Sequence, residues 1–98
     1  MAGPKRPTLR ILSPPPAGRQ FVLAGRVCII GRGEECDIVL DRPSISRRHA
    51  RIDVTDDGAV IRDLGSRNGI RVNGAPLPEA ELRPGDVLHV GKVRMHFD

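Results

Sequence analysis

Short stretches of alternating apolar and polar residues recur along the chain. The first, residues 8–12, reads Thr-Leu-Arg-Ile-Leu and has the two-residue period of a half-buried strand. A cluster of three prolines and a glycine at 14–18 then interrupts the pattern. The beginning of the chain therefore predicts a strand that ends in a tight loop.

Further strands are predicted at intervals of roughly ten residues, and Gly, Pro, Asn and Asp stand between them. Their ranges are 21–23, 27–30, 37–40, 49–54, 59–63, 70–72, 87–90 and 93–97. Two sequences, Asp56-Asp57-Gly58 and Asn73-Gly74, are typical of hairpin turns because Asn and Gly tolerate positive φ.

No stretch shows helical periodicity long enough to matter, since residues 78–82 have room for only a turn or so before Pro84 and Gly85 end it. Many short strands joined by polar turns indicate an all-β domain, either a sandwich or a barrel.

Length and composition fit one small domain. The chain has 98 residues, of which 39% are hydrophobic and only 2% aromatic, so Val, Ile and Leu must fill the interior. We expect residues 1–7 to be a flexible N-terminal tail and residues 8–98 to be the domain, which we take to be one module of a longer protein.

The net charge is +4, and fourteen of the sixteen basic residues are arginine. This surplus suits nucleic acid, acidic lipid or phosphorylated protein, and it is also ordinary for a soluble domain. The sequence has neither a signal peptide nor an apolar run that could span a membrane, so we expect no membrane partner. Two cysteines without a disulfide pattern favour a reducing, cytoplasmic setting.

Three predicted loops, at 31–32, 44–49 and 65–69, hold most of the unusual polar residues. Loops at strand ends can gather at one edge of a β-sandwich. Arginine forks, serine hydroxyls and an asparagine amide together match a phosphate group on an extended peptide. The residues concerned are Arg32, Arg47, Arg48, Arg67, Ser44, Ser46, Ser66 and Asn68.

The same segments resemble a known family. Gly31-Arg32, Ser46-Arg47-Arg48-His49, Asn68-Gly69 and Asn73-Gly74, in that order and spacing, are similar to the signature of the forkhead-associated (FHA) domain. The resemblance covers about residues 9–97. It implies an antiparallel β-sandwich of about eleven short strands that binds phosphothreonine peptides and recruits phosphorylated partner proteins in signalling or regulation.

The resemblance also implies roles for individual residues. Arg32 and Ser46 would hold the phosphate, Arg47 would add a further contact, and Asn68 would bond the ligand backbone. Two residues would support the loops: Gly31 would allow a sharp turn, and His49 would tie the loops together without touching the ligand. Asn73-Gly74 would be a hairpin turn only.

Arg67 departs from the family pattern, which usually has a small hydroxyl residue, often threonine, before the asparagine. An arginine there could reach the phosphate or an acidic ligand residue, or point into solvent. We therefore include it among the phosphopeptide-binding candidates. Preference for phosphothreonine over phosphoserine depends on one methyl group, so we expect it to be modest, about 1 to 3 kcal/mol in a tight pocket.

The same residues allow other functions to be compared with phosphopeptide binding. A phosphate-independent interaction domain of the same fold is the main alternative. Nucleic-acid binding through the basic surplus lacks aromatic stacking platforms, and we expect no nucleic-acid partner. No nucleophile, base and acid have spacings that suggest catalysis, so we expect no enzyme activity.

Metal and cofactor sites are also not expected. Cys28, Cys36, His49, His89 and His96 lack the close spacing of tetrahedral zinc ligands, and Cys28 lies in an apolar strand. The segment 31–33 has no phosphate-binding-loop ending and precedes no helix, so a nucleotide cofactor is not predicted either.

Overall fold

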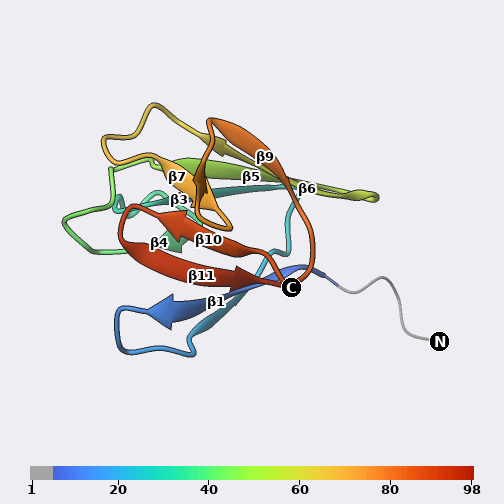
Figure 1. Ribbon diagram of the computed structural model, residues 1–98, viewed down its shortest axis with the longest axis horizontal. Coiled ribbons are helices and arrows are strands. Elements are labelled where there is room, and N and C mark those ends of the chain that lie inside the picture. The colour runs from blue at the N-terminus through green and yellow to red at the C-terminus, as the bar shows by residue number, and fades with distance from the viewer. Residues whose placement is uncertain (1–5) are drawn as a thin grey trace.

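The computed structural model describes residues 6–98 and has eleven β-strands and no helix in that range. The strands form two sheets (Figure 1). The six-stranded sheet has the order β2-β1-β11-β10-β7-β8 and comprises β1 (Thr8–Ser13), β2 (Gln20–Val22), β7 (Ile70–Val72), β8 (Ala75–Pro76), β10 (Val87–Val90) and β11 (Val93–Phe97). The five-stranded sheet has the order β4-β3-β5-β6-β9 and comprises β3 (Val27–Gly31), β4 (Ile38–Val39), β5 (Ala50–Thr55), β6 (Gly58–Asp63) and β9 (Glu79–Leu82). Within 6–98, β3 with β4 is the one parallel pair, so the predicted antiparallel sandwich is confirmed in all other pairings.

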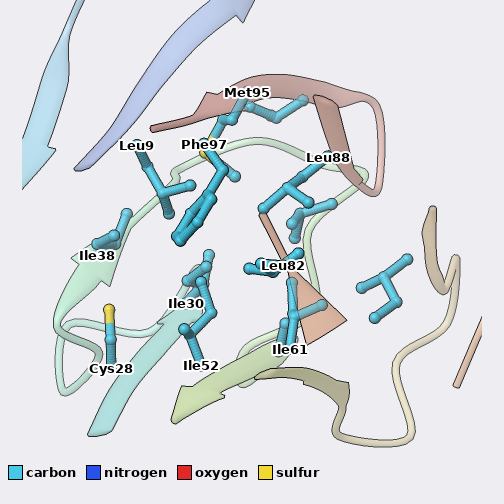
Figure 2. Packing of buried hydrophobic residues seen from close by; sticks show 14 of the residues in the cluster. Leu9, Cys28, Ile30, Ile38, Ile52, Ile61, Leu82, Leu88, Met95 and Phe97 are labelled. Atoms are coloured by element: carbon cyan, nitrogen blue, oxygen red, sulfur yellow. The ribbon is translucent and has the colours of Figure 1, made fainter. Parts of the chain in front are cut away.

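Aliphatic side chains from both sheets fill the space between them (Figure 2). Ile30, Ile52 and Ile61 point inward from the five-stranded sheet, and Leu88 and Met95 point inward from the other. All five are fully buried, as the two-residue alternation along their strands requires. The prediction that branched aliphatic residues replace rings in the interior is confirmed.

The segment that had room for a helical turn forms a strand instead, because Glu79–Leu82 is β9. It pairs antiparallel with β6, with Ala59 opposite Leu82 and Arg62 opposite Glu79. The pairing satisfies the hydrogen-bonding groups along the edge of β6 and buries Leu82 in the core. The five residues between Pro78 and Pro84 cannot sustain a helix alone, so tertiary pairing decides their conformation.

The Asn73-Gly74 turn is confirmed as the hairpin that joins β7 to β8. Asn73 has φ 50° and Gly74 has φ 87°, the positive values that a two-residue reversal requires. The Asn73 side chain donates to Asp86 Oδ1 at 3.0 Å and accepts from the Val87 N–H at 2.9 Å. The Asn73 side chain therefore connects the β7–β8 turn to the start of β10.

The chain before β1 is described only in part, since residues 1–5 of the expected tail lie outside the described range. The Pro7 carbonyl accepts a hydrogen bond from the Leu23 N–H at 2.8 Å, and the Arg6 guanidinium donates to the Ala24 carbonyl. In 6–98 the structure has no helix long and apolar enough to cross a membrane.

Candidate functional site

The three polar loops predicted from the sequence meet at one end of the sandwich. The β3–β4 loop bonds the β4–β5 loop twice, from the Arg32 N–H to the Ser46 carbonyl and from the Gly33 N–H to the Arg47 carbonyl, both at 3.0 Å. The β6–β7 loop joins them through the Arg67 N–H, which donates to Ser46 Oγ at 3.0 Å. Ser46 is thus bonded to both neighbouring loops.

The Ser46 hydroxyl keeps its own proton available. Its oxygen acts as an acceptor toward Arg67 N–H, and no acceptor for its O–H lies among the described residues. A hydroxyl can donate one bond while it accepts another. Ser46 can therefore donate to an anion placed between Arg32 and Arg67 without losing its place in the loops.

His49 supports the loops from beneath and has no solvent exposure. Its Nδ1 accepts a hydrogen bond from the Ser46 N–H at 3.0 Å. A backbone N–H can only donate, so the ring proton lies on Nε2, which donates to the Gly69 carbonyl at 2.8 Å. One buried ring thus spans the β4–β5 and β6–β7 loops.

Gly31 lies where two backbone segments come close together. It has no positive φ and lies at the end of strand β3. A Cβ on Gly31 would collide with the Arg47 carbonyl oxygen and would lie 2.8 Å from Cys36 Sγ. The glycine permits close approach of two backbones at the end of strand β3.

Asn68 is exposed, and only the Nδ2 end of its side-chain amide is hydrogen-bonded within 6–98. Its Nδ2 donates to the Ser44 carbonyl at 2.8 Å, which fixes the plane of the amide. Its Oδ1 has no partner among the described residues. A fixed amide with a free acceptor and a second N–H can bond both polar groups of a passing peptide backbone.

The three arginines near Ser46 differ in their side-chain partners. The Arg32 and Arg67 side chains are exposed and have no partner within 6–98, whereas Arg47 forms an ion pair with Glu35 at 3.6 Å. A cleft of about 370 Å³ lies between Arg32 and Arg47 and is bordered by Glu34 and Glu35. Guanidinium groups without an acidic partner can neutralise a doubly charged anion.

A larger groove of about 510 Å³ adjoins the other side of the site. Three cationic side chains and no acidic one line it, together with apolar surface. Its lining is Pro14, Arg42, Pro43, Ser44, Arg67, Asn68, Lys92 and Val93. The Lys92 N–H donates to Ser44 Oγ at 3.0 Å, which ties the β10–β11 turn to this end of the sandwich.

Sequence analysis missed the network under the β6–β7 loop. The Asp63 carboxylate accepts from the N–H groups of Gly65 and Ser66, at 3.1 and 3.0 Å, and from the Ser66 hydroxyl. Ser66 Oγ in turn accepts from the Gly69 N–H at 2.8 Å. The signal was an Asp followed three residues later by a Ser, a spacing typical of side chains that close turns.

The two cysteines lie beneath the loops as free thiols. Burial raises the pKa of Cys28 to about 11, helped by nearby Asp37, and burial also raises the pKa of Cys36. The Cys36 thiol donates to the Arg47 carbonyl at 3.2 Å. Among residues 6–98 no three His, Cys, Asp or Glu side chains are grouped to hold a metal ion.

Comparison with known proteins identifies the family of this loop arrangement. The FHA domain family model matches residues 28–91. The glycogen accumulation regulator GarA of Mycobacterium tuberculosis is 39% identical over 83 residues, which cover 85% of this chain and 51% of GarA. The chain therefore spans about half the length of this curated relative.

Solved structures agree in fold. A structure from a structural and functional analysis of phosphothreonine-dependent FHA domain interactions superposes with a TM-score of 0.87 at 35% identity and covers 94% of each chain. Mycobacterium tuberculosis EmbR in complex with a low affinity phosphopeptide gives a TM-score of 0.88 at 32% identity, over 95% of this chain and 24% of EmbR.

Proposed function

This chain belongs to the forkhead-associated (FHA) domain family, and we propose that it is a phosphothreonine-peptide-binding module. The observation that carries the proposal is the position of Ser46, bonded to Arg32 on one side and Arg67 on the other with its proton still available. Arginine clusters with added hydroxyl donors are how phospho-motif readers hold their ligands.

In this proposal the phosphate lies above Ser46. Arg32 binds two phosphate oxygens through its guanidinium fork, and Ser46 donates its free proton to a third. Arg47 leaves Glu35 and pairs with the phosphate, because a doubly charged anion attracts a guanidinium more strongly than one exposed carboxylate does. The three residues supply charge and direction together.

Asn68 recognises the peptide next to the phosphothreonine. Its Oδ1 accepts from a ligand backbone N–H while Ser44 holds the other end of the amide. Gly31 and His49 stay out of contact with the ligand and support it indirectly, since one allows two backbones to approach and the other spans two loops.

Arg67 selects a residue beside the phosphothreonine. Its side chain lines the groove together with Arg42 and Lys92, and the side chains of Arg67 and Lys92 have no partner within 6–98. A carboxylate on the ligand can pair with these cations, whereas a basic residue would be repelled. An acidic flanking residue is therefore the preferred one.

The wider assignment rests on the same module. The partner is a phosphorylated protein in the cytoplasm, and the domain acts by binding alone, without catalysis or a cofactor. Residues 8–98 make up the domain and residues 1–7 precede it as a tail. The activity of any longer protein that contains this domain is set by what the domain recruits.

Equilibrium titration with three peptide libraries tests the proposal. The libraries carry phosphothreonine, phosphoserine or unmodified threonine at one fixed central position. We expect binding to the phosphothreonine library, weaker binding to the phosphoserine library and none to the third. Equal affinity for all three would replace the proposal with the alternative, a phosphate-independent interaction domain of the same fold.

A further inference from the structure

Charge is divided unequally between the two sheets. The strands of the six-stranded sheet contain three arginines, two histidines and no acidic residue. The strands of the five-stranded sheet contain two arginines and four acidic residues. The positive surplus of the strands therefore belongs to one sheet.

These basic side chains share the outer face of the six-stranded sheet. Their neighbours along each strand point into the core, so Arg10, Arg71, His89, Arg94 and His96 point away from it. Strands β1, β11 and β10 lie side by side (Figure 1), and β7 follows β10. We call these five residues the basic face.

The register arranges the basic face in two rows across the strands. His89 is opposite Arg94 on one side and opposite Arg71 on the other, and His96 is opposite Arg10. Neighbouring strands lie about 5 Å apart, so Arg71 and Arg94, which flank His89 on either side, are roughly 10 Å apart.

The three arginines of the basic face have no acidic partner in the part of the chain that the structure describes. The Arg10 and Arg94 side chains make no hydrogen bond or ion pair within 6–98, and Arg71 bonds only the Gly74 carbonyl, at 3.3 Å. On the other sheet, by contrast, Asp53 pairs with Arg51 at 2.9 Å and Arg62 at 3.7 Å. The two sheets thus treat their arginines differently.

His89 lies between Arg71 and Arg94 at the centre of the first row. Its Nδ1 is buried and has no hydrogen-bond partner among residues 6–98. Burial, together with the charges of Arg94 and Arg71, lowers the pKa of His89 below its ordinary value. Within 6–98, no acidic side chain pairs with either of the two arginines that flank His89.

We propose that the basic face is a second docking surface, which binds an acidic segment of a protein partner without requiring phosphorylation. The inference does not depend on the proposed function, because the face lies on the sheet and not on the loops. Carboxylates accept bidentate bonds from guanidinium groups, so Arg71 and Arg94 can each bind one across His89.

The face favours an acidic protein over a nucleic acid. Only three fixed positive charges are present, whereas nucleic-acid affinity at physiological salt comes from neutralising roughly six to ten phosphates. Neither phenylalanine of the chain offers an exposed stacking platform, since Phe97 is in the core and Phe21 packs against it.

A titration of the isotope-labelled chain tests the inference. The probe is an unphosphorylated peptide of about eight alternating Glu and Ser residues, long enough to cross the four strands, and its Gln counterpart is the control. We expect the acidic peptide to shift the signals of Arg10, Arg71 and Arg94, and the Gln peptide to shift none. Shifts spread over all exposed arginines would overturn the proposal.

Two double variants test whether position or total charge matters. Arg71→Gln with Arg94→Gln removes two charges from the basic face, and Arg26→Gln with Arg83→Gln removes two from exposed loops. The first pair should weaken the acidic peptide about fivefold or more and leave phosphothreonine binding unchanged. Equal weakening by both pairs would overturn the inference, as would tighter binding of random duplex DNA to the same face.

Discussion

The hydroxyl oxygen of Ser46 accepts a hydrogen bond from the backbone N–H of Arg67 at 3.0 Å. This bond crosses from one loop to another and uses the backbone of Arg67 rather than its guanidinium. The side chain of Arg67 can therefore change without disturbing Ser46, whereas removal of the Ser46 hydroxyl also removes the contact between the two loops.

Ser46→Ala should weaken phosphothreonine-peptide binding about tenfold or more, because a hydrogen bond to a charged group contributes about 1.5 to 3 kcal/mol. The Arg67 N–H loses its acceptor too. Isothermal titration calorimetry measures the change. Thr55→Ala is the control, since that hydroxyl bonds only within its own turn. Unchanged affinity in the Ser46 variant would remove Ser46 from the site.

Arg32→Ala should raise the Kd about 30-fold, which corresponds to about 2 kcal/mol for a partly desolvated charge pair. Arg48→Ala removes the same charge from a nearby exposed position, and we expect less than about a twofold change. The comparison is made at one ionic strength. Equal losses of affinity in both variants would mean that Arg32 acts only through the net charge of the domain and has no specific contact with the phosphate.

Arg67→Ala should abolish the preference for an acidic residue beside the phosphothreonine and leave the basal affinity within about threefold. The substitution keeps the backbone N–H that Ser46 accepts, so the phosphate site stays intact. Paired peptides with Glu or Gln at each flanking position measure the preference. If the variant still favours Glu as the parent does, Arg67 points into solvent.

Gly31→Ala should lower the free energy of unfolding by about 2 kcal/mol or more, because the added methyl collides with the Arg47 carbonyl. Gly25→Ala is the control, since its Cβ would lie 3.6 Å from the nearest backbone oxygen, an ordinary contact. Urea denaturation compares the two. A Gly31 variant as stable as the Gly25 variant contradicts the close-approach argument.

Stability at high pH should depend on Cys28. Its pKa is raised in the folded state from 9.0 to about 11, so the unfolded chain loses its proton first as the pH rises. The thiol therefore stabilises the fold below about pH 9, and this contribution falls by about 2 kcal/mol on reaching about pH 10.5. Cys28→Val should show a correspondingly smaller loss of stability from neutral to alkaline pH. Identical pH profiles for the parent and the variant would contradict the shift.

Much of the fold follows from local sequence. Strand β7 matches its predicted bounds, and the Asn73-Gly74 hairpin has the positive φ values that its residues favour. Strand β9 could not be predicted, because Glu79 and Ala80 are good helix formers and only the distant edge of β6 makes them extended. Local helix or strand propensity gives no information on which distant strand edge, here that of β6, a segment will pair with.

The sequence identified candidate residues for the site, but it did not reveal the contacts that hold their loops in place. The sequence pointed to Arg32, Ser46 and Asn68, and the structure brings their loops together. It could not show that Gly31 serves close approach, nor that Asp63 closes the β6–β7 loop. Both facts depend on contacts between segments that are not neighbours in the chain.

The most direct test of the central claim is an NMR titration of the isotope-labelled chain with a phosphothreonine peptide. We predict saturable shifts at the amides of Arg32, Ser46 and Arg67, with none for the unphosphorylated peptide. Saturable shifts that avoid these loops, or equal shifts with both peptides, would contradict the claim that this end of the sandwich reads phosphothreonine.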